Sequence, residues 1–153
     1  MTEALGSGAD AVLAAALEWL IPADEHGPGA GEVGVGRYLA GALARAGDAT
    51  VARWREGLGA LDALARAREG SGFAALSPEA QDRVLGLAAD GSAEGTAAAF
   101  FEELRRRALE GMFCDPAWGG NAGEAGWHLL GYPGPRHVWT AEQQRIDPIG
   151  PQS

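Results

Sequence analysis

The chain has 153 residues, 46% of them hydrophobic and 22% charged, which suits one globular domain and argues against disorder. Its formal net charge is −9, and all twelve basic residues are arginines. Because an acidic surface repels phosphate backbones, a nucleic-acid partner is not expected. The sole cysteine, Cys114, excludes an intrachain disulfide.

Three helices are predicted in the N-terminal half from apolar residues that recur at helical spacing. The first stripe covers residues 10–20, and Pro22 ends it because proline cannot continue the hydrogen-bond ladder. The second stripe covers residues 35–46. The third helix is predicted to start after Asp48, as its N-cap, and to end at Gly70.

Two further helices follow. Ser77-Pro78-Glu79 combines an N-cap serine, a proline at the first helical position and an acid near the positive helix end. A fifth stripe begins after Ser92 and reaches Met112. Since no run of β-branched residues alternates with polar ones, we expect an all-α fold: a compact bundle of about five helices, followed by a long Gly/Trp-rich irregular C-terminal segment.

The fifth helix carries one basic cluster, Arg105, Arg106 and Arg107. Consecutive helical residues point in different directions, and three acidic residues lie within helical reach of the cluster. These are Glu102, Glu103 and Glu110. We expect a solvated, ion-paired helix face; an anion-binding or partner-binding site is the alternative.

The sequence changes character at Gly111. From there to Arg136, seven of 26 residues are glycine and no useful helical stripe is present. Long irregular segments of this kind are usually functional. One interpretation is an Ω-like loop packed by its own aromatic residues, and a compatible one is a docking surface for a partner. The aromatics beyond residue 110 are Phe113, Trp118, Trp127, Tyr132 and Trp139.

The segment lacks the patterns of common cofactor sites. Residues 119–123 have no preceding strand and no Lys-Ser/Thr pair, so a phosphate-binding loop is not expected. The three histidines, His26, His128 and His137, lack the close spacing of a zinc module. We therefore assign no cofactor-binding and no metal-binding residue.

A small catalytic site is a weaker hypothesis. Cys114 could act as a nucleophile if His128 and an orienting group such as Asp115 lay beside it in space. A buried structural thiol is the interpretation that we favour, and we assign no catalytic residue.

Two stretches resemble a known family. Residues 112–135 contain F-x-D-P-x-W-G-G-N and G-W-x-x-x-G-Y-P-G, which resemble the signature of the gluconate 2-dehydrogenase small (gamma) subunit family. Residues 20–39, LIPADEHGPGAGEVGVGRYL, resemble its N-terminal pattern. The resemblance covers roughly residues 10–140, which we take as the domain. A flexible N-terminus at 1–9 and an extended tail at 141–153 flank this domain.

The resemblance implies an accessory subunit that is not catalytic by itself and holds no cofactor. Members of the family bind, stabilise and help to mature a large FAD-containing sugar or alcohol dehydrogenase of the glucose–methanol–choline type. In many members a cytochrome c subunit, a further partner, takes the electrons. A stand-alone helical interaction protein is the alternative. We expect partner binding at Phe113, Asp115, Pro116, Trp118, Gly119, Gly120, Asn121, Trp127, Tyr132 and Pro133.

Many small subunits of the family carry a twin-arginine export leader. Here no arginine precedes Arg37. The apolar run from Ala11 to Ile21 is about 11 residues long and contains Glu18, whereas a bilayer span needs roughly 20 residues. As it stands, the sequence predicts no membrane insertion and a cytoplasmic location; a periplasmic one would require that a leader had been removed.

Overall fold

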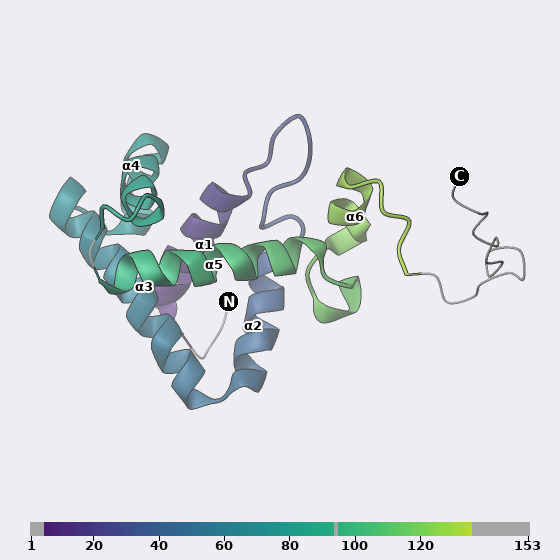
Figure 1. The fold of residues 1–153 in the computed structure, drawn as a ribbon, viewed down its shortest axis with the longest axis horizontal. Coiled ribbons are helices and arrows are strands. Elements are labelled where there is room, and N and C mark those ends of the chain that lie inside the picture. Colours follow the sequence, from purple (N-terminus) through teal and green to yellow (C-terminus); the bar gives the residue numbers. More distant parts are fainter. Residues whose placement is uncertain (1–4, 94, 136–153) are drawn as a thin grey trace, which may run out of the picture.

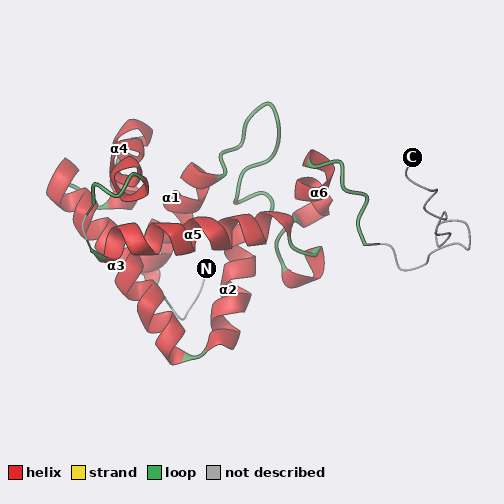
Figure 2. Ribbon diagram, in the orientation of Figure 1, coloured by secondary structure: helices red, strands yellow, loops and turns green. Residues whose placement is uncertain are grey.

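The computed structural model describes residues 5–93 and 95–135, which contain helices and no strand. Figures 1 and 2 show this architecture, which confirms the predicted all-α fold. The helices are α1 (Ser7–Leu20), α2 (Val35–Ala46), α3 (Asp48–Glu69), α4 (Pro78–Ala89), α5 (Thr96–Phe113) and α6 (Ala125–Leu129). Short 3-10 turns are η1 (Phe73–Ala75), η2 (Pro116–Trp118) and η3 (Ala122–Glu124). His137, Trp139 and the predicted tail lie outside the described residues.

All five predicted helices are present, but three of their starting points differ from the prediction. Helix α1 begins at Ser7 rather than Asp10. The N-cap prediction for Asp48 is wrong, because the turn from α2 to α3 is made by Gly47 alone, which draws Asp48 into the helix. Helix α5 begins at Thr96 rather than after Ser92.

The prediction for α4 is confirmed at the atomic level. The Ser77 hydroxyl accepts a hydrogen bond from the Ala80 backbone N–H at 3.4 Å, and Pro78 occupies the first helical turn. The delayed start of α5 also has a local cause. The Asp90 carboxylate accepts a hydrogen bond from the Ser92 N–H at 2.8 Å, which holds the chain in a turn ahead of the helix.

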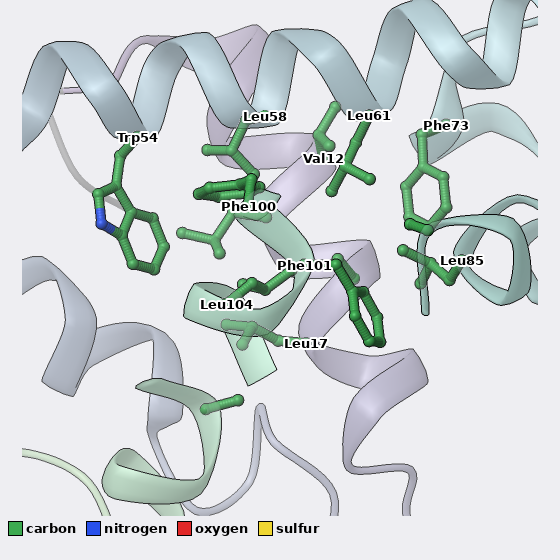
Figure 3. Packing of buried hydrophobic residues seen from close by; sticks show 14 of the residues in the cluster. Val12, Leu17, Trp54, Leu58, Leu61, Phe73, Leu85, Phe100, Phe101 and Leu104 are labelled. Carbon is green, nitrogen blue, oxygen red and sulfur yellow. The ribbon is translucent and has the colours of Figure 1, made fainter. Parts of the chain in front are cut away.

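Helix α5 is central to the core and contacts α1, α2, α3, α4 and α6 (Figure 1). Its Phe100 ring meets Trp54 of α3 edge to face, with ring centroids 5.2 Å apart (Figure 3). A Cβ atom at Gly57 would lie 2.1 Å from that ring, so glycine lets α5 lie close against α3. Phe101 packs on the other side, edge to face with Trp19 of α1.

The arginine cluster of α5 is ion-paired, as predicted. Arg105 pairs with Glu102 at 2.9 Å, while Arg106 and Arg107 both pair with Glu103 and with Glu110. The hydrogen bonds that Arg107 donates to Glu103 and Glu110 raise the pKa of Arg107 above its usual value. None of the described helices is long and apolar enough to cross a lipid bilayer.

Candidate functional site

The two stretches that resemble the family lie side by side in the fold. After α5 the chain turns through η2 and η3 into α6, next to α2 and the loop between α1 and α2 (Figure 1). The Ala122 N–H donates to the Val33 carbonyl at 3.0 Å. A Cβ atom at Gly27 would lie 3.8 Å from Leu129. We call residues 114–135 the C-terminal segment; its buried side rests on α5 and on this loop.

Asn121 holds the segment together. Its side chain is fully buried, and its backbone has a positive φ of 47°. The amide nitrogen Nδ2 donates to the Cys114 carbonyl at 2.8 Å, and Oδ1 accepts from the Gly126 N–H at 2.8 Å. Both ends of the amide are thus satisfied inside the protein, and together they tie the end of α5 to the start of α6.

Glycine permits the segment to approach the α5 backbone closely at two points. A Cβ atom at Gly120 would lie 2.2 Å from the Gly111 carbonyl oxygen. A Cβ atom at Gly126 would lie 2.2 Å from the Met112 carbonyl oxygen. The close approach lets the segment supply donors to the end of α5, whose last carbonyls have no partner within the helix. The Asn121 N–H, for example, donates to the Gly111 carbonyl at 3.0 Å.

Trp127 forms the interior of the segment. Only 7% of its surface is exposed, and its indole N–H donates to the Phe113 carbonyl at 2.8 Å. The Tyr132 ring meets it edge to face, with ring centroids 5.3 Å apart, and a Cβ atom at Gly134 would lie 3.4 Å from Trp127 Cζ3. The prediction that the segment is packed by its own aromatics is therefore confirmed for Trp127.

Trp118 lies on the outside. It is 57% exposed at the end of η2. Asp115 caps this turn, and its carboxylate accepts from the Ala117 N–H at 2.9 Å. The Arg45 guanidinium of α2 lies over the Trp118 ring, with Cζ 5.2 Å from the ring centroid. Such a contact is a cation–π interaction.

The segment also exposes other large apolar side chains. Leu129 is 51% exposed, Leu130 is 64% exposed and Tyr132 is 44% exposed. The sequence prediction missed the two leucines, because α6 has five residues and is too short to display a helical stripe. Their signal in the sequence is an apolar pair that directly follows the Trp127-His128 dipeptide.

The predicted site residues therefore share one segment but not one environment. Trp118, Tyr132, Asp115 and Pro133 are exposed, whereas Trp127 is buried. Of the others, Phe113, Pro116 and Gly119 are partly buried, and Gly120 and Asn121 are buried.

The structure does not assemble Cys114, Asp115 and His128 into a nucleophilic site. The Cys114 thiol donates to the Gly111 carbonyl at 3.5 Å, and burial raises the pKa of the thiol, which disfavours the reactive thiolate. His128 is exposed, and among the described residues no hydrogen bond or ion pair joins it to Cys114. No group of three or more His, Cys, Asp or Glu side chains in residues 5–93 and 95–135 is placed to hold a metal ion.

The sequence profile of gluconate 2-dehydrogenase subunit 3 matches residues 9–134. The chain belongs to this family. The match includes both stretches that carried the resemblance and takes in α6 and nearly all of α1. No curated protein and no solved structure shows a significant match to the sequence.

Proposed function

We propose that the chain is a non-catalytic small subunit that binds, stabilises and helps to mature a large FAD-dependent dehydrogenase of the glucose–methanol–choline type. The observation that carries the proposal is membership of the gluconate 2-dehydrogenase subunit 3 family over residues 9–134. A subunit of a dehydrogenase needs a surface for its partner, and the exposed side of the C-terminal segment is the candidate.

The exposed side has the composition of a docking surface. Trp118, Leu129, Leu130 and Tyr132 are large apolar residues with 44% or more of their surface exposed. Tryptophan and tyrosine are enriched among the residues that dominate binding energy at interfaces. The backbone beneath is held by Asn121 and Trp127 through hydrogen bonds to α5, so these side chains project from an ordered scaffold, which lowers the entropy cost of binding.

A stabilising role follows from mass action. A protein that binds only the native form of a partner stabilises it by about 2.7 kcal/mol at a hundredfold excess over the dissociation constant. A flavoprotein with an apolar docking face would otherwise expose that face and risk aggregation. Cover by this acidic helical chain would remove that risk.

The test is to express the large flavoprotein encoded beside the gene for this chain, with and without the chain. We expect lower soluble yield, a lower ratio of flavin to protein absorbance, or both, when the flavoprotein is expressed alone. Co-expression is expected to restore both. Equal yield, flavin content and melting temperature in the two preparations would contradict the maturation role, and the absence of a flavoprotein gene there would weaken the whole proposal.

The purified chain offers a second test. We expect it to be colourless and inactive in a dye-linked dehydrogenase assay with sugars and alcohols, because the flavin belongs to the large subunit. Bound flavin, or turnover by this chain alone, would contradict a non-catalytic role.

A further inference from the structure

The described arginines differ in whether they have a carboxylate partner. Carboxylates form ion pairs with Arg66, Arg83, Arg105, Arg106 and Arg107. Arg37 and Arg45 are both exposed on α2, and neither forms an ion pair with a carboxylate in the part of the chain that the structure describes. In the described part of α3, Arg53 and Arg68 are likewise exposed without an ion pair, so what sets the two arginines of α2 apart is their position beside the C-terminal segment.

Arg45 contacts Trp118, and Arg37 lies against the residue that follows it. The Arg45 guanidinium lies over its ring, at 5.2 Å from Cζ to the centroid. Arg37 lies against the next residue, since a Cβ atom at Gly119 would sit 3.2 Å from Arg37 Cγ. Gly41, between them on α2, leaves room for Arg45, because a Cβ atom there would lie 3.2 Å from Arg45 Nη1. We call Arg37, Arg45 and Trp118 the Arg–Trp patch.

The chemistry of the patch suits a carboxylate beside an apolar group. A guanidinium is planar, weakly hydrated and always charged, and it can contact an aromatic face while its N–H donors remain available to a carboxylate. The nearby carboxylates already have donors: Glu110 accepts from Tyr38, Arg106 and Arg107, and Asp115 accepts from the Ala117 N–H. The patch thus offers positive charge and an exposed indole with no competing internal partner among the described residues.

We propose that the Arg–Trp patch receives an acidic segment of the large flavoprotein, in which separate Asp or Glu side chains bind Arg37 and Arg45 and an adjacent apolar residue covers Trp118. This inference rests on the proposed function. It commits to an acidic partner surface because the guanidiniums of the patch attract carboxylates, whereas the many acidic residues elsewhere on this chain would repel them. The patch therefore fixes the orientation in which the two subunits meet.

The test compares charge reversals at two exposed arginines without ion pairs. Arg45→Glu alters the patch, whereas Arg68→Glu makes the same change of charge near the end of α3. Binding to the immobilised flavoprotein is measured at low and high salt. We expect Arg45→Glu to weaken binding about tenfold or more at low salt, with a smaller effect at high salt, and Arg68→Glu to change it less than about twofold. Arg45→Lys, which keeps the charge but not the planar group, should fall between.

Each outcome separates this inference from the proposed function. If the wild-type chain does not bind the flavoprotein, the proposed function fails. If the wild type binds and Arg45→Glu and Arg37→Glu bind equally well, only the docking role of the patch is overturned. If Arg68→Glu weakens binding as much as Arg45→Glu does, the effect is one of general charge, and the docking role of the patch is also overturned.

A second copy of the chain is the remaining occupant to test. If Arg45→Glu converts a dimer of the free chain into a monomer and leaves flavoprotein binding unchanged, the patch is a self-association surface and the inference is wrong. Circular dichroism and melting temperature show whether each variant is folded. If Arg45→Glu has a lower melting temperature than the wild type, Arg45→Gln removes the charge with less perturbation. Flavoprotein binding by Arg45→Gln is then compared with binding by Arg68→Gln, and an equal affinity of the two variants would overturn the docking role of the patch.

Discussion

The two tryptophans of the C-terminal segment lie nine positions apart and have opposite environments. Trp127 is buried and donates its indole N–H to the Phe113 carbonyl at the end of α5. Trp118 is exposed, and its ring is covered in part by the Arg45 guanidinium. The buried half of the segment builds the scaffold, and the exposed half presents side chains to solvent.

This division shows how a glycine-rich segment can be ordered without a long helix. The last turn of α5 and the residue after it leave carbonyls that the helix cannot satisfy. The segment supplies donors to three of them, since the Gly111, Phe113 and Cys114 carbonyls accept from Asn121 and Trp127. The exposed half can therefore vary in sequence at little cost in stability, while the buried half cannot.

Replacing the two tryptophans by alanine should separate the halves most clearly. Trp127→Ala removes a buried ring and the donor to Phe113, so we expect a loss of about 4 kcal/mol in the free energy of unfolding. Trp118→Ala should change it by less than about 0.5 kcal/mol, because the side chain is mostly in water. Urea denaturation followed by circular dichroism measures both values. Equal losses would mean that the division between the halves is wrong.

Adding a methyl group at Gly126 tests the close contact with α5. In Gly126→Ala the new Cβ atom would lie 2.2 Å from the Met112 carbonyl oxygen, a backbone atom that cannot move without shifting the helix. We expect a loss of about 3 kcal/mol. Gly59→Ala is the matched control, since a Cβ atom there meets nothing within 4 Å inside α3. The free energy of unfolding of Gly59→Ala should be unchanged or up to about 1 kcal/mol higher. If Gly126→Ala also leaves the free energy of unfolding unchanged, α6 can move away from α5 and the close contact is not required.

The helices with long apolar stripes could be predicted from the sequence because their signal is local. Ser77-Pro78 was identifiable for the same reason, since a capping hydroxyl and its N–H lie three residues apart. The sequence prediction missed helix α6 because five residues are too few to show an apolar period. Its start is fixed instead by a tertiary contact, in which Asn121 Oδ1 accepts from the Gly126 N–H.

The environments of the site residues were not available from local patterns. Trp118 and Trp127 have similar neighbours in the sequence, with glycine adjacent to each. What distinguishes them is tertiary: a carbonyl of α5 accepts from one, and an arginine of α2 lies over the other. The pairing of Arg45 with Trp118 joins residues from distant parts of the chain, and no spacing rule anticipates it.

The amide of Asn121 offers a finer test of the buried half. Asn121→Ala leaves the Cys114 carbonyl and the Gly126 N–H without their buried partner, and it places alanine at a positive φ. We expect a loss of about 2 kcal/mol, smaller than for Trp127→Ala. Asn121→Gly removes the same hydrogen bonds but suits the backbone, so it should cost less in thermal or urea unfolding than Asn121→Ala. If glycine is the more damaging substitution, the positive φ contributes nothing to the cost.

The smallest expected effect concerns the Cys114 thiol, which lies where the C-terminal segment leaves α5. Burial raises its pKa, so at a given pH less of the reactive thiolate is present than in a free cysteine. Because the pKa of the thiol is higher in the folded state than in the unfolded state, the protonated thiol contributes to the free energy of unfolding. This contribution is fully present below the unfolded-state pKa of about 8.5 and is lost as the pH rises through the folded-state pKa. We therefore expect the rate of iodoacetamide alkylation to rise with pH, with a midpoint at higher pH than for a cysteine peptide. At a fixed pH, the rate should increase when urea unfolds the protein. A midpoint below that of the peptide would indicate an activated thiol, and it would return the catalytic hypothesis for Cys114 to consideration.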